Sequence, residues 1–204
     1  MVTDAELVAF MRVTAVGDGA AARQMLSRVP ELALAQLGQA GKGATAEFFL
    51  EERLLQVYVG DSALHVAAAS YDTQLARRLV AAGADVRVRN RRGAEPLHSA
   101  VNGVPGSAAW DPRQQVAVIR YLVSVGADPD ARAAGGVTPL HRAARNRCAA
   151  AVRTLLDVGA DPDLLNDSGS TALTLAQQFT GRGGTGSPEA KSQQAEIIRM
   201  LTDG

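Results

Sequence analysis

A sequence unit that recurs every 33 residues is the feature that most constrains how this chain can fold. Its clearest copy, GGVTPLHRAARNRCAAAVRTLLDVGADPD, occupies residues 135–163. The leucine near the start of the unit recurs at this interval, once with ten additional residues, at Leu64, Leu97, Leu140 and Leu173. Gly-Ala-Asp triplets keep the same register, beginning at Gly83, Gly126 and Gly159. Because one such unit cannot bury its apolar side alone, the copies are expected to stack against each other.

Each unit is expected to form two short antiparallel helices. The hydroxyl of Thr138 can cap the first helix, and Pro139 suits its first position, where a missing N–H costs nothing. Gly159 is typical of the left-handed residue that ends a helix. The second helix carries an apolar stripe made of Val152, Leu155 and Leu156.

The cores of the four units read DSALHVAAA, AEPLHSAV, VTPLHRAAR and STALTLAQ. A period near 33 with a TPLHxAA core resembles the ankyrin repeat, in register over about residues 57–204 and only loosely before that. The resemblance implies an all-α fold, an ankyrin-repeat solenoid of paired antiparallel helices with β-turn-like finger loops. Four positions depart from the pattern, namely Ala63, Glu95, Ala172 and Thr174.

The chain divides in this interpretation into a degenerate N-terminal repeat with a linker, residues 1–56, and four ankyrin repeats. Two helices are expected within residues 4–34, the first capped by Asp4, and the apolar segment 47–59 is expected to pack over them as a helix. Asp111-Pro112 and Ser187-Pro188 are helix-start signatures that follow two insertions, which should emerge from the same edge. The predicted repeats are 57–89, 90–132 with the first insertion, 133–165, and 166–204 with the second.

Composition excludes several classes of function. Lysine plus arginine balance aspartate plus glutamate, so the net charge is zero and argues against nucleic-acid binding. Asp4 and Glu6 stand where a signal peptide would be basic, no long apolar run appears, and a single cysteine fits a reducing compartment. We therefore expect a cytoplasmic monomer that does not bind membranes, and the predominance of arginine over lysine favours a bacterial genome.

Three histidines, His65, His98 and His141, occupy the same repeat position. Shared ligation of a metal ion would need them within bonding distance of one point, whereas successive repeats are roughly 10 Å apart and zinc–nitrogen bonds are near 2 Å. The resemblance implies instead that each ring bonds groups that hold adjacent loops. No metal, cofactor or catalytic residue is expected, so the chain is predicted not to be an enzyme.

Two other patterns have competing interpretations. Gly181, Gly183 and Gly186 spell GxGxxG, but no strand precedes them, so a glycine-rich linker is favoured over a dinucleotide loop, with an anion-binding loop aided by Arg182 as the alternative. Cys148 begins a helix beside arginines, which would lower the pKa of its thiol, although a packing role is favoured. Trp110 is either an exposed anchor for a partner or a pin that holds its loop, and the sequence favours neither.

The resemblance implies binding of another protein through the finger tips and the concave face of the inner helices. Arg87, Arg89, Arg91 and Arg92 could meet acidic groups, although solvated turn tips of alternating charge along the array are the simpler account. The rival interpretation is a small-molecule, anion or thiol-redox site on the insertion edge, formed by Trp110, Arg145, Cys148 and Arg182. The candidate partner-binding residues are Tyr58, Asp61, Arg91, Arg92, Asn102, Trp110, Arg145, Asn146, Ser168, Ser170 and Gln178.

Overall fold

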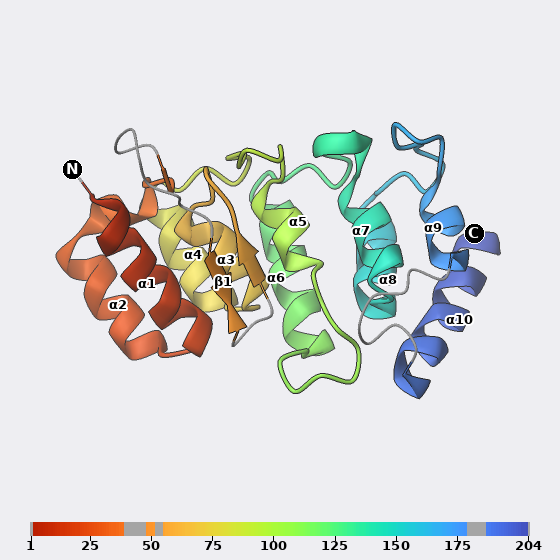
Figure 1. Ribbon diagram of the computed structural model, residues 1–204, viewed down its shortest axis with the longest axis horizontal. Helices are drawn as coiled ribbons and strands as arrows, with labels where there is room; N and C mark the ends of the chain where they lie inside the picture. Colours follow the sequence, from red (N-terminus) through yellow and green to blue (C-terminus); the bar gives the residue numbers. More distant parts are fainter. Residues whose placement is uncertain (1, 39–47, 52–54, 179–186, 204) are drawn as a thin grey trace. The chain divides into compact units, whose positions relative to one another are not determined.

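The computed structural model describes residues 2–38, 48–51, 55–178 and 187–203 (Figure 1). The chain forms two compact units, Met1–Ala100 and Val101–Gly204. In both of them short helices pack side by side in two layers, with loops joining successive helices. Within each unit, the helix pairs therefore stack against each other, as the repeats predict.

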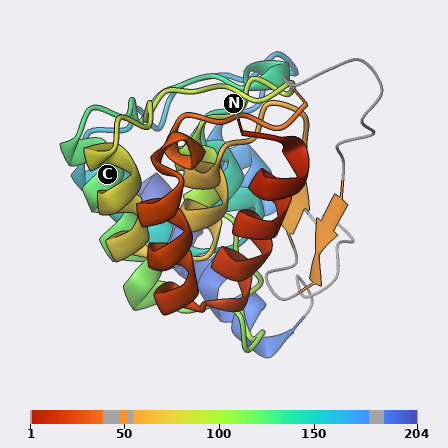
Figure 2. The same cartoon turned by 90° about the vertical axis from the view of Figure 1, so that its left-hand side faces the viewer.

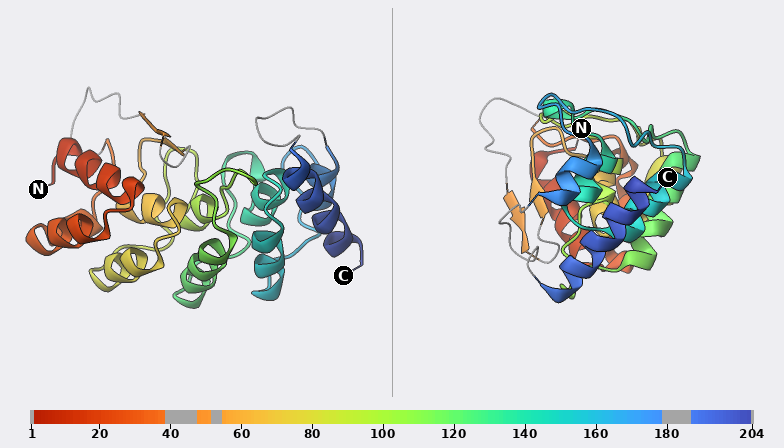
Figure 3. Two further views of the ribbon diagram at one scale, coloured as in Figure 1. Left: turned by 90° about the horizontal axis from the view of Figure 1, so that it is seen from below. Right: turned by 90° about the vertical axis from the view of Figure 1, so that its right-hand side faces the viewer.

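In the first unit the first helices of successive pairs, α1, α3 and α5, lie side by side, and α2 packs beside α4 (Figure 3). Helices α3 and α5 are in contact, and Ala67 and Ala68 of α3 and Ala100 of α5 are fully buried. The helices are α1 (Asp4–Val16), α2 (Gly19–Arg28), the 3-10 helix η1 (Pro30–Ala33), α3 (Ala63–Ala69), α4 (Thr73–Ala81) and α5 (Pro96–Ala100).

The second unit repeats this arrangement, with α7 against α9 in one layer and α6, α8 and α10 in the other. Asp111 caps α6 and Ser187 caps α10, each followed by a proline in the first turn, as the helix-start signatures predict. The helices are α6 (Pro112–Ser124), the 3-10 helix η3 (Ala134–Gly136), α7 (Pro139–Arg145), α8 (Ala149–Asp157), α9 (Ala172–Gln177) and α10 (Pro188–Thr202).

The cap of α1 differs from the prediction. Thr3, not Asp4, is the N-cap, and it forms a capping box in which Glu6 accepts the Thr3 N–H at 2.8 Å. The reciprocal bonds satisfy two helix-end donors, which a lone aspartate one residue later does not achieve. Asp4 lies inside the helix, where its carboxylate accepts the Gly38 N–H at 3.1 Å.

The apolar segment that follows the linker is a β-hairpin, so the predicted helix at 47–59 is wrong. Strands β1 (Phe48–Leu50) and β2 (Leu55–Val57) pair antiparallel (Figure 2). Arg12 of α1 lies over the Phe48 ring, 5.2 Å from its centre. Leu50, Leu55 and Val57 are buried whereas Phe49 is 46% exposed. This alternation has the period of a strand, and it puts Leu50, Leu55 and Val57 on one face without a helix.

The buried stripe of α6 also differs from the prediction. The apolar spacing after Asp111-Pro112 predicts that Val116, Ile119 and Val123 point inward, but Val116 and Val123 are only half buried. Val118, Ile119 and Leu122 are fully buried, and so is the polar Gln115. The helix is rotated so that the Gln115 amide faces inward, where it has partners described below.

None of the described helices is long and apolar enough to cross a membrane.

Candidate functional site

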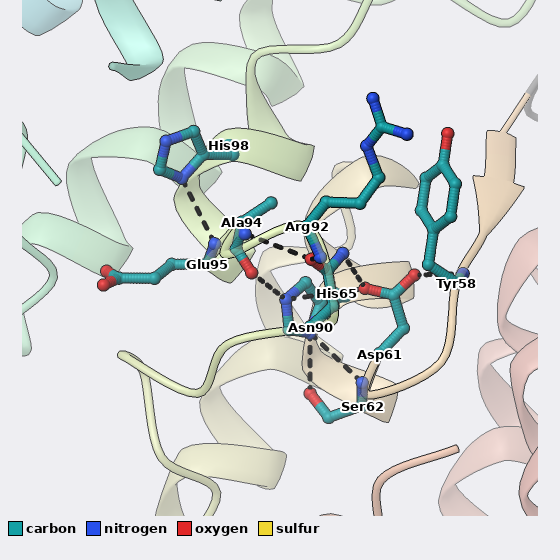
Figure 4. Close-up of polar contacts among 9 residues, drawn as sticks. All are labelled: Tyr58, Asp61, Ser62, His65, Asn90, Arg92, Ala94, Glu95 and His98. Atoms are coloured by element: carbon teal, nitrogen blue, oxygen red, sulfur yellow. Dashed lines mark hydrogen bonds and ion pairs between the residues drawn. The ribbon is translucent and has the colours of Figure 1, made fainter. Parts of the chain in front are cut away.

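Buried histidines tie consecutive finger loops together. The Ser62 N–H donates to His65 Nδ1 at 3.1 Å, so the ring proton is on Nε2, which donates to the Ala94 carbonyl at 3.0 Å (Figure 4). His141 Nε2 likewise donates to the Ser170 carbonyl at 2.9 Å. Each of these two rings therefore links its own helix start to the next finger, and the predicted structural role is confirmed for His65 and His141.

A buried carboxylate organises the finger tip of the first unit. Asp61 Oδ2 accepts the Tyr58 N–H and Asp61 Oδ1 accepts from Asn90 Nδ2, each at 2.8 Å. Asn90 Oδ1 in turn accepts the N–H groups of Arg92 and Ala94, at 2.9 and 3.0 Å. Side chains from two successive fingers thereby fix the backbone of both (Figure 4).

The same two fingers touch through their backbones at Gly60. Gly60 has a φ of +85°, and a Cβ built on it would lie 2.8 Å from Asn90 Cα. The neighbouring Arg91 N–H donates to the Val59 carbonyl at 2.8 Å. Only glycine allows this approach, because a side chain would both strain the backbone and collide with the next finger.

Above this rigid base three side chains gather, and we call them the tyrosine–arginine cluster: Tyr58, Arg91 and Arg92. The guanidinium carbons of Arg91 and Arg92 lie 5.8 and 5.4 Å from the centre of the Tyr58 ring, within cation–π range. Both arginines are exposed, and Tyr58 is half buried. Figure 4 shows Tyr58 and Arg92 extending in parallel away from the buried network.

The other two arginines of the predicted patch do not join this cluster. Arg89 Nη2 lies 3.0 Å from Oε1 of Glu95, whose side chain is buried. Arg87 is exposed, and its backbone N–H donates to Asp85. Glu95, which departs from the repeat pattern at the capping threonine, therefore places a carboxylate where it neutralises one arginine of the finger.

In the second unit Trp110 is held by Gln115, a residue that no sequence pattern singles out. Trp110 Nε1 donates to Gln115 Oε1 at 3.2 Å, and Gln115 Nε2 donates to the Asn102 carbonyl at 3.2 Å. Asn146 Nδ2 reaches Asn102 Oδ1 at 3.4 Å. Trp110, Asn102 and Asn146 are thus brought together, in agreement with the interpretation of Trp110 as a pin for its loop.

The thiol of Cys148 lies beneath this group, and the hypothesis of a lowered pKa is wrong. Its side chain is fully buried, and burial raises the pKa of the thiol to about 12. A Cβ on Gly103 would lie 2.7 Å from Cys148 Sγ and 2.8 Å from Trp110 Cδ1, so the loop closes directly over the sulfur. The penalty for burying the thiolate outweighs any lowering of the pKa by the helix start and the neighbouring arginines.

We predict that native Cys148 resists thiol reagents. Because the pKa is about 12, only about one Cys148 thiol in ten thousand is ionised at pH 8. Labelling by a chromogenic disulfide should therefore be slow in the folded protein and complete within minutes in denaturant. Gly103→Ala, which crowds Trp110 away from the sulfur, should accelerate labelling; stoichiometric labelling of the unmodified native protein would contradict this account.

Of the two remaining residues of the rival site, Arg145 and Arg182, the structure describes only Arg145. Arg145 is half buried at the end of α7. Arg182 and the glycines Gly181, Gly183 and Gly186 lie outside the described residues. The end of the second insertion is nevertheless close to the first, since a Cβ on Gly106 would lie 3.8 Å from Glu189 Cβ.

Aspartates line the fingers of the second unit. Asp130 Oδ1 accepts the Asp161 N–H at 3.0 Å, and partial burial raises the pKa of Asp130, with Asp128 and Asp161 adding repulsion that the hydrogen bond opposes. Beyond them Ser168 is exposed, Ser170 is half buried with its carbonyl bonded to His141, and Gln178 is exposed just after α9.

Asp130→Asn is predicted to stabilise the protein near neutral pH, because asparagine keeps the acceptor for Asp161 N–H without the charge. A raised pKa means that the folded state holds the proton more tightly than the unfolded state, so stability falls as pH rises through the native pKa. The gain should be below about 1 kcal/mol, given solvent screening, and should vanish in acid. Denaturant titrations at pH 3 and pH 7 measure it, with exposed Asp163→Asn as control; an equal gain at both pH values would contradict it.

Helix pairs in register, joined finger to finger by buried histidines, define a protein built from helical repeats. A family model described as ankyrin repeats (3 copies) matches residues 32–133 and again residues 106–203, so the chain belongs to the ankyrin-repeat family. The predicted all-α ankyrin fold is thereby confirmed, with the match beginning earlier than residue 57. No curated protein matches the chain significantly. Ankyrin repeats are generally protein–protein interaction modules and are typically not enzymes.

Proposed function

We propose that this protein is an adaptor that binds another protein through its finger tips and the exposed ends of its first helices. The observation that supports this most is the tyrosine–arginine cluster, whose exposed side chains rest on a backbone fixed by Asp61, Asn90 and Gly60. A surface that is already ordered loses little conformational entropy on binding, so modest contacts yield useful affinity.

Within the predicted set, the residues differ in what they can contribute. Arg91 and Arg92 are exposed and Tyr58 is half buried, whereas Asp61 is buried with both oxygens engaged and would act by holding the backbone beneath them. In the second unit Ser168 and Gln178 are exposed, and Asn102, Trp110, Arg145, Asn146 and Ser170 are half buried around α7 and its flanking loops. We propose these residues as a second contact surface, considered independently of the first.

Three further assignments belong to the same proposal. The repeat boundaries 57–89, 90–132, 133–165 and 166–204, after an N-terminal region of residues 1–56, stay a prediction. We infer a cytoplasmic monomer, on the grounds of the balanced charge and the single cysteine. The thiol-redox alternative is not retained, because Cys148 is buried with a raised pKa.

Affinity capture from the native host tests the adaptor function. The tagged protein should retain one partner protein at a stoichiometric ratio, and Arg91→Glu combined with Arg92→Glu should release it. Arg77→Glu combined with Arg78→Glu is the matched control, since this exposed pair on α4 undergoes the same charge change away from the tip. Failure of the unmodified protein to retain any partner would contradict the proposal.

A further inference from the structure

The charge of the first unit's finger tip is distributed unevenly between its interior and its surface. The carboxylate nearest the tip, Asp61, is 4% exposed and spends both oxygens on Tyr58 N–H and Asn90 Nδ2. Glu95 is likewise buried and paired with Arg89. The carboxylates of Asp61 and Glu95 are therefore held inside, whereas the guanidinium groups of the tyrosine–arginine cluster are held outside.

The cluster places two cations against one ring. Arg91 and Arg92 both lie within 6 Å of the Tyr58 ring centre, at 5.8 and 5.4 Å. The ring face attracts each guanidinium, but the two like charges repel each other, and an anion bound beside them would relieve that repulsion. The planar guanidinium can present two parallel N–H groups to a carboxylate, which gives the contact a defined orientation.

The apolar side chain of Phe49 lies on the face of the hairpin that continues to Tyr58 of the cluster. Phe49 pairs with Gln56 across the hairpin, and side chains of one strand alternate between faces, so Gln56 and the following Tyr58 share a side with Phe49. The burial pattern agrees, because Leu55 and Val57 are buried between them. Phe49, 46% exposed, is the aromatic member of this face outside the cluster.

We propose that the tyrosine–arginine cluster and Phe49 form a subsite for an extended acidic segment of the partner protein. Carboxylates of the segment bind the Arg91 and Arg92 guanidinium groups, and a neighbouring apolar side chain packs on Phe49. This inference rests on the proposed adaptor function and specifies the chemistry of the partner. A nucleic acid fits less well, because the whole chain is electrically neutral and the cluster offers two cations rather than a track of them.

A fluorescent peptide of alternating glutamate and glycine with one central phenylalanine tests the subsite directly. It should bind the full chain, and binding should weaken as salt is raised, because exposed charges are screened. The same peptide with glutamine for glutamate should not bind. Arg91→Glu with Arg92→Glu should reduce affinity at least about tenfold, through repulsion of the carboxylates. Arg77→Glu with Arg78→Glu should leave affinity unchanged, and circular dichroism should show both variants folded.

Further measurements distinguish the contribution of the Tyr58 ring from that of the arginine charges, and they test the acidic subsite apart from the adaptor function. Tyr58→Phe keeps the ring face and should bind as the unmodified protein does, whereas Tyr58→Ala should weaken binding. Equal binding of the glutamine peptide, or tighter binding of duplex DNA or of a phosphoserine version of the peptide, would overturn the proposal. If a captured partner persists on the Arg91→Glu, Arg92→Glu variant, the adaptor function is supported and the acidic subsite is refuted. If no partner is captured but the peptide binds, the acidic subsite is supported and the adaptor function is refuted.

Discussion

Replacement of His141 by alanine should lower the free energy of unfolding by about 2–4 kcal/mol, since it leaves buried polar groups without partners. The His141 ring accepts the Thr138 N–H at Nδ1 and donates from Nε2 to the Ser170 carbonyl, across two fingers. Both bonds are lost at once, and the alanine leaves a cavity where the ring was. Equilibrium denaturation by urea, monitored by circular dichroism, measures the change.

Thr174→Ala is the matched control for this experiment. Thr174 occupies the histidine position of the last repeat, but it is exposed, and among the described residues its hydrogen bonds are to Thr171 in its own turn. Its loss should change stability by no more than about 0.5 kcal/mol. If the two variants were equally stable, the interpretation of His141 as a link between fingers would have to be abandoned.

The pH dependence of stability gives a second readout for His141. Burial lowers the pKa of His141 below its ordinary value of 6.5, with the charges of Arg132 and Arg145 acting in the same direction. The unfolded chain therefore takes up a proton at a pH where the folded protein does not, and stability should fall as pH drops below 6.5. His141→Ala should remove this part of the slope.

Gly60→Ala should cost about 2–4 kcal/mol, from backbone strain at a positive φ together with collision against the next finger. The added Cβ would lie 2.8 Å from Asn90 Cα and 3.2 Å from Arg91 N, both backbone atoms that cannot rotate aside. Because Asn90 and Arg91 must shift, the tyrosine–arginine cluster should also be disturbed. Urea denaturation and partner binding should therefore both report the change.

Gly159→Ala separates the two components of that cost. Gly159 has a φ of +95° and nothing within 4 Å of where its Cβ would lie, so only backbone strain applies, at about 1–2 kcal/mol. Partner binding at the first finger should not change. An equal loss of stability in the two variants would mean that the contact between Gly60 and Asn90 contributes nothing.

The sequence predicts the local structure correctly wherever one residue determines the conformation of its neighbours. Thr138, Asp111 and Ser187 cap their helices as predicted, since a cap depends on groups within three residues. The proximity of Tyr58 to Arg91 also follows from the period, because the two are 33 residues apart in register. The cation–π geometry does not follow, since it depends on rotamers chosen by the surrounding structure.

The misinterpreted elements are those that depend on distant contacts. The run at 48–57 has apolar residues compatible with either period, and only its packing on α1 through Phe48 and Arg12 distinguishes a strand from a helix. The burial of Gln115 does not follow from the sequence, because it depends on Trp110 and the Asn102 carbonyl, which satisfy its amide inside. For Cys148 the favoured packing role agrees with its burial, whereas the alternative of a lowered thiol pKa considered only neighbours in sequence and not the 103–110 loop that closes over the sulfur.

Asp61 supports the finger backbone, whereas the three side chains of the tyrosine–arginine cluster point outward, and this difference has a practical consequence. Asp61 and Asn90 hold the shape of the tip, and the main-chain N–H groups of Tyr58, Arg91 and Arg92 are bonded within it. The outward groups can consequently be exchanged for others while the supporting frame is kept. Such a finger is a natural grafting point, at which a designer could rewrite the choice of target without redesigning the scaffold.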